Sequence, residues 1–156
     1  MLTSENIMTR FLAVCLLFVL LVSALCQARD LAVVVNKNNK ASQLTAMELE
    51  KLFKAGIQNW PDGTKIEIFL TGTDSADNAM ILQRAFKLTP EEIKTSVAAH
   101  KGDIRVVGSD EVVLTLVNTN AGAIGIVNVY SINSRVKVLK VDGKLPMEPG
   151  YLLHGN

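Results

Sequence analysis

The segment from Leu44 to Gly63 constrains the fold most, because it holds the start signal, the apolar face and the following turn of one helix. Thr45 and Glu48 form a capping-box pattern, in which each side chain accepts a hydrogen bond from the other residue's backbone amide. Apolar residues then recur at helical spacing; they are Ala46, Leu49, Leu52 and Phe53. Proline and glycine in Trp60-Pro61-Asp62-Gly63 favour a turn. The segment therefore predicts a helix after Thr45, then a turn, then a strand.

The rest of the chain alternates between strand-like and helix-like patterns. Short apolar or alternating segments predict strands at residues 31–35, 65–70, 104–107, 123–127 and 135–141. Helical spacing or capping signals predict further helices at residues 79–86, 89–100 and 109–117. A strand is the alternative for the last of these, because it is rich in β-branched residues. The alternation predicts an α/β sandwich whose central sheet, mixed or mostly parallel, has about five strands flanked by helices.

The N-terminal segment has the pattern of a secretory signal peptide. Residues 11–25 are uncharged and largely apolar, Arg10 precedes them, and small residues stand at and just after their end, at Ala24, Cys26 and Ala28. The run is shorter than the roughly twenty residues of a membrane-spanning helix, although a retained anchor stays open as the alternative. We expect residues 1–28 to be a signal peptide cleaved near Ala28. Residues 29–156 would then be one periplasmic or secreted domain without a stable membrane span.

Charge and cysteine usage argue against several function classes. The chain has 16 basic and 15 acidic residues, and removing Arg10 and Glu5 with the signal peptide leaves the net charge at +1. This balance gives no support for nucleic-acid binding. Cys15 and Cys26 both lie in the predicted signal peptide. The exported domain would therefore contain no disulfide, thiol nucleophile or cysteine metal site.

Isolated polar and aromatic residues favour structural roles. His100 and His154 lack any partner at metal-ligand spacing, and no serine has the context of a hydrolase nucleophile. We therefore expect no enzyme activity, no metal and no cofactor. Trp60, at a junction between helix, turn and strand, is expected to pack between elements rather than stack on a planar ligand. The loop Asn36–Lys40 is expected to be a solvated connection, with contact to a ligand or partner as the alternative.

Two separate motifs resemble a known family. Gln43-Leu44-Thr45, Leu52-Phe53, Gly56 and Asn59-Trp60-Pro61-Asp62-Gly63 are similar to the segment L-T-x-x-E-L-x-x-I-F-x-G-x-I-x-N-W-x-D-G of periplasmic phosphate-binding proteins. Gly108-Ser109 and Asn120-Ala121-Gly122-Ala123-Ile124-Gly125 are similar to that family's G-S and N-P-G-A-I-G-Y stretches. The resemblance spans residues 31–139. It implies the type II solute-binding fold of ABC uptake systems and the binding of a small anion.

The family's phosphate loop, R-x-D-G-S-G-T, follows the strand after the W-x-D-G motif. The corresponding place here is Leu70 to Asp77, where Asp74 and Ser75 match the acid and the serine and no arginine precedes them. Exposed amides at a helix N-terminus, with nearby hydroxyls and the helix dipole, can hold an anion. The candidate oxyanion ligands are Thr71, Gly72, Thr73, Asp74, Ser75 and Asp77. Simple helix capping by Ser75 or Asp74 is the alternative.

These observations predict an exported, non-enzymatic solute-binding domain. It would bind phosphate or another small oxyanion for ABC-type uptake, with an ABC permease or another envelope protein as its partner. The alternative is an interaction or sensory accessory domain that kept the fold and lost the ligand. Members of the family have two lobes, whereas this chain resembles one lobe. Two copies could therefore rebuild a cleft as a homodimer.

Overall fold

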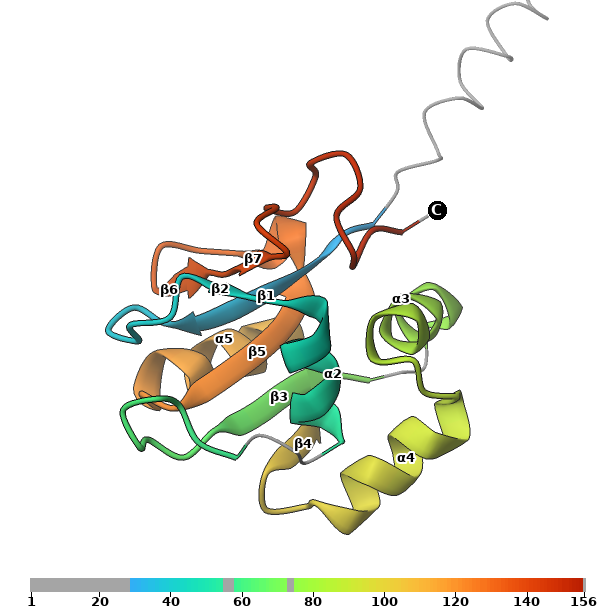
Figure 1. Cartoon of the computed structure of the whole chain (residues 1–156), viewed down its shortest axis with the longest axis horizontal. Coiled ribbons are helices and arrows are strands. Elements are labelled where there is room, and N and C mark those ends of the chain that lie inside the picture. The colour runs from blue at the N-terminus through green and yellow to red at the C-terminus, as the bar shows by residue number, and fades with distance from the viewer. Residues whose placement is uncertain (1–28, 55–57, 73–74, 156) are drawn as a thin grey trace, which may run out of the picture.

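The computed structural model describes residues 29–54, 58–72 and 75–155 (Figure 1). The predicted signal peptide at residues 1–28, and Gly56 of the first family motif, lie outside the described residues. Within the described ranges, no helix is long and apolar enough to cross a membrane.

A five-stranded mixed sheet forms the centre of the domain. Its strands lie in the order β4-β3-β5-β1-β6. Their bounds are Leu31–Asn36 for β1, Glu67–Thr71 for β3, Ile104–Val107 for β4, Ala123–Asn128 for β5 and Val136–Val138 for β6. β3 runs parallel to both β4 and β5, whereas β1 is antiparallel to β5 and β6. The predicted α/β class and the mixed five-stranded sheet are confirmed.

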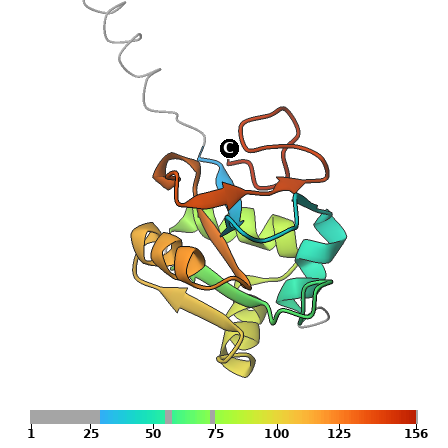
Figure 2. The same cartoon turned by 90° about the vertical axis from the view of Figure 1, so that its left-hand side faces the viewer.

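Helices cover both faces of this sheet (Figures 1 and 2). Their bounds are Ala46–Phe53 for α2, Ala76–Phe86 for α3, Pro90–Ala99 for α4 and Asp110–Thr119 for α5. Val33 and Val35 of β1 share a core with α2, α3 and α4, and Val34 shares the opposite core with α5. Alternate residues of β1 thus serve two cores, which explains why its sequence is a continuous apolar run. Residues 110–119 form a helix, not the strand held as the alternative.

Both capping boxes are present. The Thr45 hydroxyl accepts from the Glu48 amide, and the Glu48 carboxylate accepts from the Thr45 amide at 2.8 Å. Thr89 and Glu92 make the same exchange, with Pro90 at the first helical position. The backbone amide of each threonine lowers the pKa of its glutamate. These two helix starts therefore form as the sequence predicts.

The predicted strand at residues 135–141 is divided into two. β6 ends at Val138, and Lys140–Val141 forms β7, which pairs in parallel with β2, Gln43–Leu44. At this point the buried apolar positions change from even-numbered to odd-numbered residues. Val136 and Val138 pack on the α5 side, whereas Leu139 and Val141 belong to the core under α2. The single strand was therefore wrong, because β6 pairs with β1, whereas β7 pairs with β2.

The C-terminal segment, which has no clear periodicity, packs back against the start of β1. Tyr151 and Leu153 are buried, and the Leu31 amide donates to the Leu153 carbonyl at 2.9 Å. His154 Nδ1 lies 2.5 Å from Oδ1 of Asp30, a residue that is 3% exposed. Tertiary contacts order this segment where local sequence signals are weak.

Gly125 lies where the side chains of α5 pack tightly on the sheet, and it gives a stability prediction. A Cβ at this position would lie 2.6 Å from Val113 Cγ1 and 2.9 Å from Val117 Cγ2. Valine side chains have little freedom to move aside. We expect Gly125→Ala to lower the free energy of unfolding by about 1–3 kcal/mol, measured by urea denaturation. Gly102→Ala is the control, because a Cβ there meets nothing within 4 Å; equal losses in both variants would contradict the packing argument.

The capping box at Thr89 gives a prediction about pH. The pKa of Glu92 is lowered in the folded state, so its stabilising effect is present above the ordinary glutamate pKa and is lost as pH falls through the folded value. We expect Glu92→Gln, which keeps the hydrogen bond without the charge, to lose less stability than the unmodified protein between about pH 6 and about pH 3. Glu91→Gln, outside the capping box, should lose stability over this pH range as steeply as the unmodified protein does. Unfolding free energies across this range are the measurement.

Candidate functional site

The predicted anion loop lies at one edge of the central sheet. β3, β4 and β5 are parallel, so their carboxyl ends meet at the same edge. Ligands of α/β proteins commonly bind beyond the carboxyl ends of such strands. The loop that leaves β3 at this edge leads directly to the N-terminus of α3. The predicted strand-to-helix position of the loop is therefore confirmed.

The predicted ligand residues occupy different parts of this connection. Thr71 ends β3, and Gly72, also partly buried, follows it. Ser75 is the N-cap of α3, and its hydroxyl accepts from the Asn78 amide at 3.5 Å. Thr73 and Asp74 lie outside the described residues, as does the side chain of Asp77 in the first turn of α3. The capping role held as the alternative for Ser75 is present; whether an anion also binds stays a prediction.

Asp110 organises the polar contacts beside this loop. Its Oδ1 accepts from the Thr71 hydroxyl at 3.0 Å. Its Oδ2 accepts from the Asn128 amide at 3.0 Å and from the Ser131 hydroxyl at 2.6 Å. One half-buried carboxylate in the first turn of α5 thus joins the carboxyl ends of β3 and β5. The sequence predicted a helix at residues 109–117, but not the partners of the Asp110 side chain.

This arrangement has two chemical consequences at the candidate site. The Thr71 hydroxyl already donates to a carboxylate, so it can offer an anion only a lone pair unless it rotates away from Asp110. Residues 71–77 contain no lysine or arginine, so any anion there depends on amides, hydroxyls and the dipole of α3. The site is therefore suited to hydrogen bonding more than to charge pairing.

The other residues singled out in the sequence have structural partners. Trp60 is 7% exposed, and its indole N–H donates to the Gly122 carbonyl at 3.1 Å. This confirms the packing role, although the side chain also lines a pocket. His100 Nδ1 lies 3.0 Å from the Ser96 carbonyl, and His154 contacts Asp30. No group of three potential metal ligands occurs in the part of the chain that the structure describes.

Family comparison agrees with the fold and the two sequence motifs. The PBP superfamily domain matches residues 25–150, and the chain therefore belongs to this family. No curated protein matches the chain.

Solved structures with the same fold include several proteins described as phosphate-binding. An ABC-type phosphate transport receptor from Vibrio cholerae is 23% identical, with a TM-score of 0.67, covering 82% of this chain and 54% of that one. PstS from Borrelia burgdorferi is 21% identical, with a TM-score of 0.66 and coverages of 83% and 55%. A putative phosphate ABC transporter substrate-binding protein with bound phosphate, from Clostridium perfringens, is 21% identical, with a TM-score of 0.62 and coverages of 74% and 46%. The chain thus spans about half the length of these proteins.

The Asp110 contacts give a prediction about stability. Asp110→Ala would leave the Asn128 amide and the Ser131 hydroxyl without their acceptor. We expect a loss of about 1–3 kcal/mol in the free energy of unfolding. Glu111→Ala is the matched control, because Glu111 lies in the same helical turn but pairs with Arg135 at the exposed surface. A similar loss of stability in both variants would mean that the removed negative charge acted on the dipole of α5. The hydrogen bonds of Asp110 would then not explain the effect.

Proposed function

We propose that the chain is an exported solute-binding domain that binds phosphate or a related small oxyanion for ABC-type uptake. Family membership and the fold support a solute-binding role. The single observation that carries the choice of site is the loop from Thr71 to Asp77, which connects a parallel strand to the N-terminus of an 11-residue helix. Free amides at such a terminus attract an anion.

In this proposal the groups of the loop have distinct roles. The first amides of α3 donate to the anion, and the Ser75 hydroxyl can donate its proton while its oxygen still accepts from Asn78. Asp74 accepts a hydrogen bond from the O–H of a partly protonated oxyanion, which favours hydrogen phosphate over sulfate. Export through cleavage near Ala28 would deliver the domain to the periplasm or the cell exterior, where an ABC permease would be the partner.

In the same proposal, a second protein surface completes the anion site. The relatives with this fold are about twice as long as the matched region, so one lobe here corresponds to roughly half of each. Tyr130 and Val112, beside the Asp110 contacts, are 62% and 44% exposed. A second copy of the chain, or an envelope protein, would cover this edge and enclose the anion.

Calorimetric titration with phosphate, sulfate and molybdate tests anion binding. We expect saturable heat with phosphate and an about tenfold weaker affinity in Ser75→Ala, because one hydrogen bond to the anion is lost. Ser109→Ala is the matched control, since Ser109 caps α5 as Ser75 caps α3 but lies outside the loop. Equal affinities of Ser75→Ala and Ser109→Ala for phosphate would place the anion elsewhere.

Sedimentation with and without phosphate tests whether two copies of the chain form a dimer.

The alternative function is an interaction or sensory accessory domain in the cell envelope that binds no anion. Two observations favour it: the Thr71 hydroxyl is already bonded to Asp110, and the loop carries no basic residue. In that case phosphate produces no heat at millimolar concentration, and Asp74→Ala with Ser75→Ala leaves function unchanged. Recovery of the same envelope partner by the unmodified domain and by this double variant would then identify the function.

A further inference from the structure

A concave site lies at the opposite edge of the sheet from the anion loop. We call it the Trp60 pocket. It lies where β3 and β5 begin, because Ile66 precedes β3 and the Trp60 indole is bonded to Gly122, just before β5. Its volume is about 610 Å³, within the range of roughly 300–1,000 Å³ that small-molecule sites occupy. Its floor consists of four buried apolar side chains, those of Leu44, Leu52, Trp60 and Ile66.

The polar groups of Trp60 on this floor are already bonded within the protein. The indole N–H, the only polar atom among the four floor side chains, donates to the Gly122 carbonyl at 3.1 Å. The Trp60 amide donates to the Thr64 carbonyl at 2.8 Å, and the Trp60 carbonyl accepts from the Gly63 amide at 2.8 Å. A polar group placed on this floor would lose its water without gaining a partner. The buried part of a ligand must therefore be apolar.

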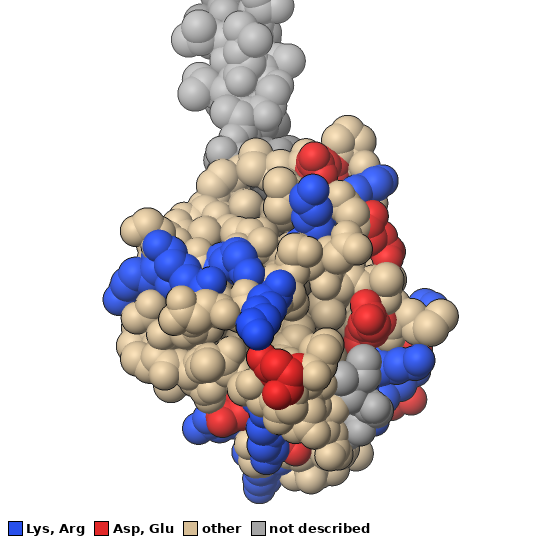
Figure 3. All heavy atoms as spheres, turned by 60° about the vertical axis from the view of Figure 1, so that its left-hand side comes forward, with Lys and Arg blue, Asp and Glu red and all other residues tan. Residues whose placement is uncertain are grey.

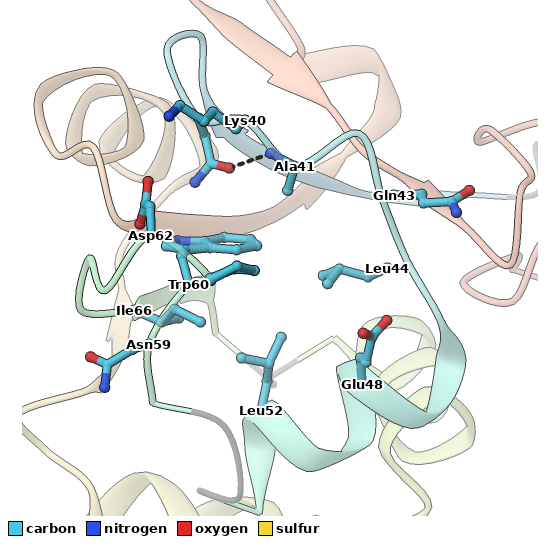
Figure 4. A pocket seen from close by; sticks show the side chains of 12 residues that line it. Lys40, Ala41, Gln43, Leu44, Glu48, Leu52, Asn59, Trp60, Asp62 and Ile66 are labelled. Atoms are coloured by element: carbon cyan, nitrogen blue, oxygen red, sulfur yellow. Dashed lines mark hydrogen bonds between the residues drawn. The ribbon is translucent and has the colours of Figure 1, made fainter.

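The side-chain amides on the walls do not offer such a partner either. Asn39 Oδ1 accepts from the Ala41 amide at 2.9 Å. In Figure 4, the amide groups of Gln43 and Asn59 point away from Trp60. The bond between Asn39 and Ala41 also holds the loop after β1 in place before any ligand enters, which reduces the entropic cost of binding.

Two charged groups at the rim of the pocket offset each other. Lys40 and Asp62 stand on the same side of the pocket in Figure 4. The Thr64 amide, which donates to Asp62 Oδ1 at 2.9 Å, and to a smaller degree the Lys40 charge, lower the pKa of Asp62. Both side chains are exposed. A charged ligand near this pair would be attracted by one group and repelled by the other.

Glu48, on the opposite wall, also has a basic neighbour. The amide and hydroxyl of Thr45, and to a smaller degree the Lys51 charge, lower the pKa of Glu48. Lys40 and Lys51 balance Glu48 and Asp62, so these exposed groups together carry no net charge. Figure 3 shows basic side chains at the left of one face of the domain and acidic side chains close to basic ones on the rest of it. The rim therefore favours a ligand of neither sign.

We propose that the Trp60 pocket binds an uncharged small molecule with a hydrocarbon body, aromatic or aliphatic. The hydrocarbon body lies on the floor against Trp60 and Leu52, and any polar end of the molecule stays in water at the open side. Apolar contact drives the binding, because the floor has no free polar side chain and the rim has no net charge. This site is separate from the anion loop and does not depend on the proposed function.

Trp60 provides a direct readout, because it is the only tryptophan of the chain. The experiment titrates the protein, as purified from expressing cells, with N-phenylnaphthylamine, an uncharged fluorescent probe that absorbs where tryptophan emits. We expect saturable quenching of Trp60 and a matching rise in probe emission, since energy transfer requires the probe to lie near the indole. Anilinonaphthalenesulfonate has the same rings and a sulfonate fixed beside them. We expect it to bind about tenfold more weakly, because the sulfonate loses water without gaining an unpaired cation.

Ala41→Phe tests where the probe binds. Ala41 lines the pocket, and its bond to Asn39 uses the backbone amide, so the substitution leaves that bond in place. The added phenyl group should fill the hollow and weaken binding of the uncharged probe by about tenfold or more. Ala98→Phe is the matched control, because it adds the same ring at an exposed position of α4 outside the pocket. It should bind the probe as the unmodified protein does.

The two variants also control for binding elsewhere, because the apolar residues 11–25 are the same in both. Circular dichroism and urea denaturation check that both variants fold, and the comparison of the two probes on the unmodified protein needs no variant. Three results would each overturn the proposal, whatever the outcome with phosphate. They are no quenching of Trp60 by the uncharged probe, equal affinity of Ala41→Phe and Ala98→Phe for it, and equal affinity of the unmodified protein for both probes.

Discussion

The burial of β1 on both faces is the constraint on which the rest of the structure depends. All six of its residues are buried, and it joins β5 to β6 inside the sheet. Its polar ends are buried too. Asp30, just before the strand, accepts from the Met147 amide at 2.6 Å, and the Asn36 side chain donates to the Val117 and Asn118 carbonyls at the end of α5. Because buried polar groups are costly without partners, these bonds fix the C-terminal segment and α5 against one strand.

Local signals were sufficient where an element is determined by neighbouring residues. The two capping boxes, the proline at the start of α4 and the apolar alternation of β3 are all short-range patterns, and the structure contains each element they predict. The division of residues 135–141 required knowledge of the pairing partner on either side of Leu139, which is β1 before it and β2 after it. The C-terminal segment was also not predictable, because its order comes from Asp30 and Leu31, more than a hundred residues earlier in the chain.

The candidate site, like the fold, was predictable from the sequence only in part. Its position was predictable, because a strand, a loop of small residues and a helix follow one another in the sequence. The Asp110 contacts were not, because they join residues separated by 39, 18 and 21 positions. The Trp60 pocket combines the loop after β1, α2 and the turn before β3. Trp60 was correctly interpreted as a packed side chain. Sequence alone could not reveal that the packed ring also borders a hollow.

The two edges of the sheet place different physical demands on a ligand. At the carboxyl edge, an anion would rest on helix amides with one side uncovered, and water would compete for every hydrogen bond. Small-molecule sites usually bury at least about 70% of the ligand, and in the proposal a second protein surface supplies part of this burial. At the amino edge, the Trp60 pocket is already concave and lined by four buried apolar side chains. Affinity at the first edge therefore depends on a second surface, whereas affinity at the second depends only on this chain.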